Sequence, residues 1–146
     1  MKNLIVIHEA KTIAGLNWSA LPDESRATKE AENITKLWQD KLTRIDSDRF
    51  KKEVKIGKDL KEKIDLVDFQ EMTAYDLKVS EKNLGHEFYK DLFKVLAYNQ
   101  NRVFKLEKLV FIAGPSGIDE LEKSLGKFAA GFLKALGVTV ELVRLD

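Results

Sequence analysis

The chain has 146 residues, a length that fits one domain, residues 1–146, with enough buried surface to fold without disulfide bonds. Hydrophobic residues make up 44% and charged residues 34%, and the absence of cysteine excludes a disulfide framework, a cysteine-based zinc site and cysteine catalysis. The net charge of +1 excludes a uniformly basic nucleic-acid binder, and the short apolar runs predict a soluble, cytoplasmic protein with no membrane contact.

The first half of the chain predicts a long helix followed by three strands. Leu4–Ile7 is a short apolar run that fits either a strand or the start of a helix. The long helix opens at Asp23 after Pro22, and its apolar residues recur at three- and four-residue steps up to Ile45. Period-two alternation then predicts a strand around Val54 and Ile56, and two more strands at residues 64–69 and 72–79.

The third of these strands has two different faces. One face carries Tyr75, Leu77 and Val79, and the other carries Ala74, Asp76 and Lys78. We expect the first face to lie under the later helix that contains Leu92 and Leu96, because that burial contributes about 1.5–3 kcal/mol for each large side chain.

The second half alternates helices and strands. The predicted elements are a helix at 86–99, an apolar strand at 109–114, a helix at 118–136 followed by a glycine cap at Gly137, and a strand at 138–145. The whole order is α-β-β-β-α-β-α-β. This order predicts an α/β fold with a mixed β-sheet flanked by helices.

Two carboxylates and a lysine carry the strongest chemical signal. Asp65 lies in an apolar strand, where an unpaired acid is costly, and Asp76 and Lys78 project from one face of the next strand. The connection between the strands is short enough for a hairpin, which would bring Asp65 and Asp76 together beside Lys78. Oxygen ligands of this kind suit Mg²⁺ or Mn²⁺, with the lysine near a polarised water or a phosphoryl oxygen. The alternative is that Asp65 caps the end of a strand and that Asp76 and Lys78 are an exposed pair on the sheet surface.

The motif in its context resembles the PD-(D/E)xK nuclease superfamily, which has the restriction-endonuclease-like fold. Asp65 matches the first acid, Asp76 the second acid and Lys78 the lysine, over a resemblance that spans roughly residues 27–145. Ile64 stands where the family motif often has proline. The resemblance implies Mg²⁺- or Mn²⁺-dependent hydrolysis of phosphodiester bonds in DNA, and a homodimer to cut both strands.

Many members of that superfamily also place a glutamate near the metal, on the helix before the sheet. Glu30 and Glu32 are the candidates here. Glu30 borders the apolar face of the predicted helix, whereas Glu32 points roughly opposite, toward water. Glu30 is therefore the predicted third acid, and its alternative is an ordinary surface glutamate.

A lysine-rich segment precedes the acidic strand. Between Arg49 and Lys63, seven basic residues stand against three acidic residues, so the segment carries a charge of 7 − 3 = +4. The functional interpretation is a surface that contacts the phosphates of DNA. The alternative is a hairpin that is only solvated. The predicted DNA-binding residues are Lys51, Lys52, Lys55, Lys58, Lys61 and Lys63.

Competing sites are weaker. The Gly114–Gly117 corner lacks the spacing of a phosphate-binding loop, and Ser116 is better interpreted as a helix cap. The two histidines, His8 and His86, do not form a zinc motif. Two other classes stay open: a catalytically inactive module of the same fold that binds DNA or a protein, and a flavodoxin-like small-molecule enzyme, which the antiparallel hairpin disfavours.

Overall fold

The structure is a computed structural model that describes residues 4–17, 24–80 and 83–146. Nine helices and strands lie in these ranges. They are α1 (Leu4–Asn17), α2 (Glu24–Ile45), β1 (Phe50–Lys55), β2 (Lys63–Asp68), β3 (Thr73–Lys78), α3 (Leu84–Asn99), β4 (Lys108–Ala113), α4 (Pro115–Ala135) and β5 (Thr139–Arg144). The predicted opening of the long helix at Pro22 and Asp23 lies outside the described residues.

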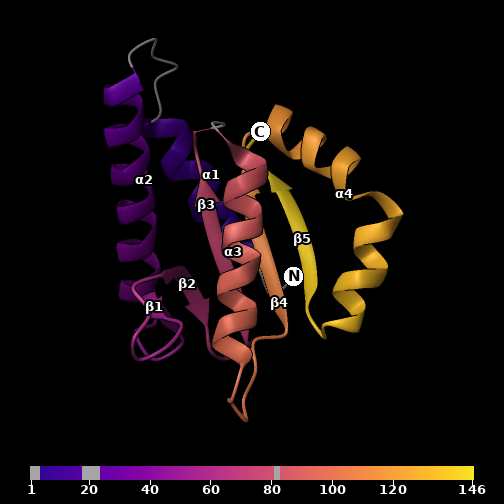
Figure 1. Cartoon of the computed structure of the whole chain (residues 1–146). Helices are drawn as coiled ribbons and strands as arrows, with labels where there is room; N and C mark the ends of the chain where they lie inside the picture. Colours follow the sequence, from indigo (N-terminus) through magenta and orange to yellow (C-terminus); the bar gives the residue numbers. More distant parts are fainter. Residues whose placement is uncertain (1–3, 18–23, 81–82) are drawn as a thin grey trace.

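The five strands form one mixed sheet in the order β1-β2-β3-β4-β5. The first three strands pair antiparallel, and β3, β4 and β5 pair parallel, with α3 and α4 as the crossovers. Figure 1 shows α3 across one face of the sheet, α4 beside β5, and α1 with α2 on the other side. The protein is therefore a mixed α/β structure in which helices flank a five-stranded sheet. The predicted order of elements occurs from α2 onward, and α1 precedes it.

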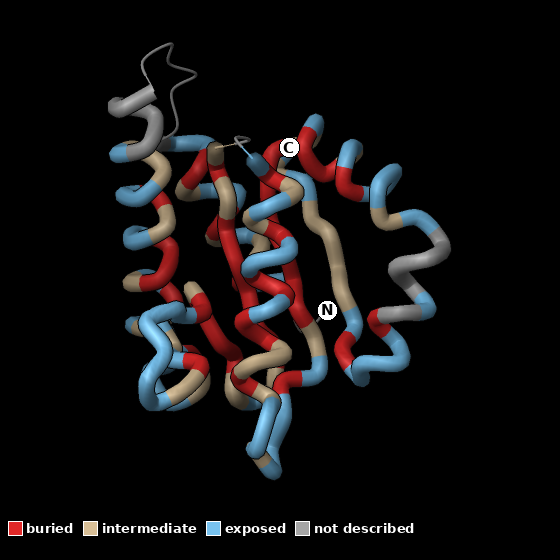
Figure 2. The backbone as a smooth tube through the Cα atoms, viewed as in Figure 1, coloured by how far each residue is buried: buried red, intermediate tan, exposed pale blue. Residues whose placement is uncertain are grey.

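Each face of the sheet has its own apolar core. Val6, Ile34 and Trp38 of α1 and α2 pack against Leu66 and Tyr75 on one face. On the other face, residues of α3 and α4 pack against β3 and β4, among them Phe88, Val95, Leu109, Phe111 and Ile118. Figure 2 shows the resulting band of buried residues along the two central strands. The α2 helix is amphipathic because its apolar residues recur at helical spacing.

The prediction for the apolar face of the third strand is wrong in one respect. Tyr75, Leu77 and Val79 are buried as expected, but they pack under α1 and α2 rather than under the helix of Leu92 and Leu96. The α3 helix covers the opposite face, where Ala74 packs and Asp76 is buried. The reason is that α2, with its long apolar stripe, covers the larger side chains of β3.

An ion pair fixes the turn between β2 and β3. Arg49 forms a two-pronged contact with the buried Asp68, with Nη2 to Oδ2 at 2.8 Å. The Oδ1 of Asp68 also accepts the backbone N–H groups of Gln70 and Glu71, at 3.0 and 3.2 Å. These bonds satisfy the turn and hold the register in which Leu66 faces Tyr75. The register in turn decides which residues meet further along the two strands.

The structure decides one open alternative and moves the start of one predicted helix. The undecided run Leu4–Ile7 is the first part of α1. The α4 helix begins at Pro115, a residue suited to the first helical position, so Ser116 lies inside the first turn instead of capping it. The predicted cap at Gly137 is confirmed by its φ of 75°. Among the described residues, no helix combines the length and apolar character needed to cross a membrane.

We expect Trp38→Ala to destabilise the protein strongly. Trp38 of α2 is fully buried between α1 and the sheet, and its Nε1 donates to the carbonyl of Val6 at 3.1 Å. Its removal should lower the free energy of unfolding by about 3–5 kcal/mol in urea titrations. The neighbouring Leu37 is 38% exposed, so Leu37→Ala is the control, with an expected loss below about 1 kcal/mol. Equal losses in the two variants would contradict the packing described here.

Candidate active site

The pairing of β2 with β3 stops where the two predicted acids meet. The paired residues are Asp68 with Thr73, Val67 with Ala74 and Leu66 with Tyr75, so the same register would next place Asp65 opposite Asp76. At this point, hydrogen bonds to side-chain carboxylates take the place of the backbone hydrogen bonds between the two strands. The backbone N–H of Asp65 donates to Asp76 Oδ1 at 3.4 Å, and the N–H of Leu77 donates to Asp65 Oδ2 at 3.3 Å. The hairpin therefore brings Asp65 and Asp76 together.

The pairing of β1 with β2 is interrupted at the same residue. Lys52 pairs with Leu66 and Val54 pairs with Ile64, but the ladder passes over Glu53 and Asp65. Glu53 has a left-handed backbone with φ of 49°, which is unusual for a residue with a side chain. The carbonyl of Asp65 instead accepts a hydrogen bond from Gln39 Nε2 of α2, at 2.7 Å. Asp65 is thus separated from both neighbouring ladders and is held partly by side chains.

Lys78 lies among three carboxylates. Its Nζ is 3.9 Å from Asp65 Oδ2, 3.8 Å from Glu87 Oε2 and 3.6 Å from Asp91 Oδ2. The lysine side chain is 21% exposed, so it reaches solvent while most of it is buried. The predicted grouping of Asp65, Asp76 and Lys78 is therefore present in space, and α3 adds further charged groups to it.

Sequence reasoning missed the contribution of α3. Asp91 is fully buried, and Lys94 is 3.2 Å from it with a side chain that is 7% exposed. A signal was present in the sequence: Asp91 follows Phe88 by three residues and precedes Val95 by four, so it falls within the buried stripe of the helix. A charged residue within such a stripe is costly unless it is paired, which makes it a candidate for a site.

Burial raises the pKa values of the two inner acids. The pKa of Asp76 is well above its usual range because the group is completely buried and lies near the negative charges of Asp91 and Asp65. Burial likewise raises the pKa of Asp91 to about 6, although Lys78 and Lys94 oppose the shift. For Lys78, burial favours the neutral amine, but Asp65 and Asp91 outweigh it and raise its pKa. The inner acids therefore bind protons more tightly than exposed acids do, and Lys78 stays charged.

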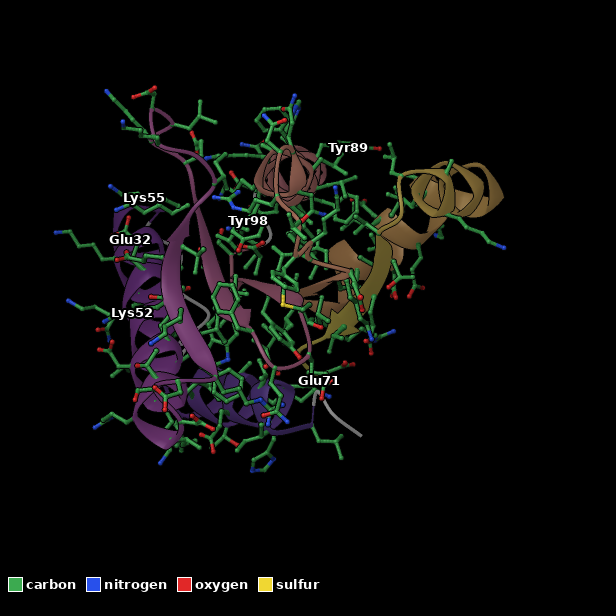
Figure 3. The ribbon with its side chains drawn as sticks, turned by 90° about the horizontal axis from the view of Figure 1, so that it is seen from below. Glu32, Lys52, Lys55, Glu71, Tyr89 and Tyr98 are labelled. Atoms are coloured by element: carbon green, nitrogen blue, oxygen red, sulfur yellow. The ribbon has the colours of Figure 1, made fainter. Side chains whose placement is uncertain are left out.

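A cleft of about 870 Å³ opens beside this cluster. Its walls come from α2, β1, the ends of β2 and β3, and the start of α3. Among the lining residues are Glu32, Gln39, Lys52, Glu53, Asp65, Lys78 and Glu87. Figure 3 shows Glu32, Lys52 and Lys55 on one side of the molecule, along α2 and β1. Asp65 and Lys78 thus face the cleft, whereas Asp76 has no exposed surface.

The structure places the two candidate glutamates differently from the expectation. Glu30 is half-buried and is not part of the cleft lining, while Glu32 is exposed and lines it. The cleft lies along the side of α2 next to β1, rather than over the apolar stripe that Glu30 borders. Helical geometry separates the two positions correctly, but it does not tell on which side of the helix a cleft opens.

The six predicted DNA-binding lysines are all exposed. Lys52 forms an ion pair with Asp40 at 2.6 Å and lines the cleft, so it connects this surface with the site. Lys55 and Lys63 are directly opposite each other in the β1–β2 ladder. Like charges in that arrangement repel each other, and a bound polyanion would relieve the repulsion.

The residues present fit a divalent cation that keeps most of its water. Asp76 Oδ2 is buried and finds no hydrogen-bond partner among the described residues, and the Asp65 carboxylate faces the cleft nearby. Mg²⁺ is commonly bound by one or two carboxylates, with waters completing its shell. A larger protein cage is not seen: the described ranges contain no group of three His, Asp or Glu side chains arranged to hold a metal.

Comparisons of the chain with protein-family models, with curated proteins and with solved structures found no match. The functional argument therefore depends on the geometry of this site.

The raised pKa of Asp91 predicts a pH dependence of stability. The folded chain keeps this carboxyl protonated up to about pH 6, whereas the unfolded chain releases the proton near the ordinary aspartate pKa of 3.8. The free energy of unfolding therefore falls as the pH rises through this window. Asp91→Asn should remove this contribution, so its stability relative to the wild type rises by up to about 3 kcal/mol across the window. Urea titrations at several pH values measure the difference, with the exposed Asp48→Asn as the control. A constant difference across the window would contradict the prediction.

Proposed function

We propose that the protein is a metal-dependent nuclease that hydrolyses phosphodiester bonds in DNA, of the PD-(D/E)xK type with a restriction-endonuclease-like fold. One observation carries the proposal: at the end of the β2–β3 ladder, Asp76 accepts a hydrogen bond from the backbone of Asp65, Asp65 accepts one from the backbone of Leu77, and Lys78 lies beside Asp65 at the cleft. The mixed sheet, with its antiparallel meander followed by parallel strands, supports it.

Charge balance also supports a divalent cation. Asp65, Asp76, Glu87 and Asp91 set four carboxylates against the two ammonium groups of Lys78 and Lys94, which leaves two negative charges when all are ionised. The cluster is mostly buried, so water neutralises this excess poorly. A divalent cation balances the excess negative charge of the cluster. Without the cation, a proton on Asp76 reduces this excess by one charge.

In the proposed mechanism the residues of this chain have separate tasks. Asp65 and Asp76 would hold Mg²⁺ or Mn²⁺, which supplies Lewis-acid stabilisation of phosphate charge when bound. Lys78 keeps its proton, because the surrounding acids raise its pKa, and it stabilises the negative charge that develops on the attacked phosphate. Gln39 holds the backbone of Asp65, which fixes the direction of its carboxylate toward the cleft.

The partner of the site would be DNA, which lies against the lysines of the β1–β2 hairpin, and a homodimer would supply the second cut. Glu30 remains the predicted third acid, and Glu32 is its matched comparison because it lines the cleft. The alternative function is a catalytically inactive module of the same fold that binds DNA or a protein. The complete burial of Asp76 favours this alternative, because a metal ion in the cleft binds only carboxylates that it can reach.

Plasmid cleavage tests the proposed activity directly. The wild type should nick or linearise plasmid DNA in the presence of Mg²⁺ or Mn²⁺ and should be inactive with a chelator. Asp65→Asn should abolish cleavage without unfolding the protein. Lys78→Ala should lower the rate by about 100-fold or more while DNA and metal binding persist, because it removes charge stabilisation of the transition state.

Lys108→Ala is the matched control for the lysine variant. Lys108 lies on the neighbouring strand at the opposite end of the sheet and forms a partly exposed ion pair with Glu141. This variant should retain the wild-type rate. Glu30→Gln and Glu32→Gln, measured side by side, decide which glutamate assists. A wild type that binds DNA but never cleaves it with either cation would reject the nuclease proposal in favour of the binding module.

The lysine surface makes a separate prediction about salt. The triple variant Lys55→Glu, Lys58→Glu and Lys61→Glu should weaken DNA binding, and each lost phosphate contact should reduce the slope of log affinity against log salt by about 0.9. Fluorescence anisotropy with a DNA duplex in chelator measures both quantities. Charge reversal of three exposed lysines elsewhere, Lys105, Lys123 and Lys134, is the control. Equal slopes in the two triple variants would show that the hairpin lysines do not contact phosphate.

A further inference from the structure

Lys78 of β3 is held by acids of two other elements, β2 and α3, at distances that leave it between its partners. The distances from its Nζ to Asp91, Glu87 and Asp65 are 3.6, 3.8 and 3.9 Å. None of them is as short as a typical charge-assisted hydrogen bond, so no single contact fixes the ammonium group. The side chain of Asp91 is 0% exposed, against 20% for Asp65 and 37% for Glu87. Its attraction is therefore the least screened of the three.

Asp91 is held in turn by Lys94 on the next turn of α3. The Nζ of Lys94 is 3.2 Å from Asp91 Oδ1, and both side chains are buried among apolar residues such as Phe88 and Val95. Neither Asp91 nor Lys94 is among the residues that line the cleft. The pair therefore does not touch a substrate in the cleft, and the contact of Asp91 with Lys78 connects it with a residue that lines the cleft.

We infer that Asp91 and Lys94 are positioning residues, and that this buried ion pair fixes the place of the Lys78 ammonium beside Asp65. The inference rests on the proposed function, in which Lys78 stabilises charge on a phosphate. The other role open to the pair is to connect α3 with β3. Removal of one partner of a buried ion pair is strongly destabilising because it leaves the other charge unpaired, and removal of both charges avoids that penalty. A merely structural pair is therefore dispensable for activity once both charges are removed.

The double variant Asp91→Asn with Lys94→Gln separates the two roles, because it removes one charge of each sign and leaves the net charge of the cluster unchanged. We expect kcat for plasmid cleavage to fall on the order of 100-fold, as for a misplaced catalytic group. The KM for DNA should stay within about twofold, because the pair does not contact the substrate. The midpoint of urea unfolding should stay close to that of the wild type.

A second ion pair of the same helix provides the control. Lys90 of α3 lies 3.7 Å from Glu62, and both side chains are about half exposed. Lys90→Gln with Glu62→Gln should leave kcat unchanged. If the double variant at Asp91 and Lys94 does not fold, Asp91→Glu replaces it: this variant keeps the charge, moves the carboxylate by one methylene and should lower kcat without changing KM.

A measurement without DNA keeps the inference independent of the nuclease activity. Carbon relaxation of the Lys78 side chain should give a high order parameter in the wild type and a value near that of the exposed Lys123 in the double variant. If the wild type does not cleave DNA but Lys78 becomes mobile in the variant, the proposed function fails and the positioning role stands. If both kcat and the order parameter stay at wild-type values, the inference is overturned.

Discussion

The Asp76 carboxylate stands between the central strand β3 and helix α3 with no exposed surface. A buried carboxylate is tolerated only where hydrogen bonds, opposite charges or a proton compensate for lost water. Here the backbone of Asp65 supplies a hydrogen bond, Lys78 and Lys94 supply positive charge, and the raised pKa favours a proton. The end of the β2–β3 ladder at Asp65 and the buried charges of Asp91 and Lys94 on α3 both lie around this group.

The sequence predicted the elements from α2 onward and the proximity of Asp65 to Asp76 because local signals determine both. The apolar spacing around Ile34, Trp38 and Leu42 is enough to define α2, and alternation is enough to define the strands. The proximity of Asp65 and Asp76 could be predicted because a short turn allows the two strands of a hairpin only a few pairing registers. The ion pair of Arg49 with Asp68 that fixes this register was not predicted, since the two residues are 19 positions apart.

Other features depend on how elements pack, which no local pattern encodes. Both faces of β3 are buried, so alternation gave the two sets of residues correctly but could not say which helix covers which set. For the same reason, the side of α2 that borders the cleft could not be derived, and Glu32 rather than Glu30 lies there. Asp91 and Lys94 were within reach of sequence reasoning, because charged residues at apolar helix positions are an anomaly that calls for partners.

The connectivity of the sheet determines the order in which the residues of the charged cluster assemble during folding. Asp65 and Asp76 are 11 residues apart in an antiparallel meander, a contact of short sequence separation that closes a small loop. Lys78 belongs to the same meander, whereas Asp91 and Lys94 arrive with α3, which docks as the crossover to the parallel strand β4. A chain emerging from the ribosome exposes Asp65 and Asp76 before Asp91 and Lys94 leave it. Until that crossover docks, water has to solvate the Asp76 carboxylate that the folded protein buries completely.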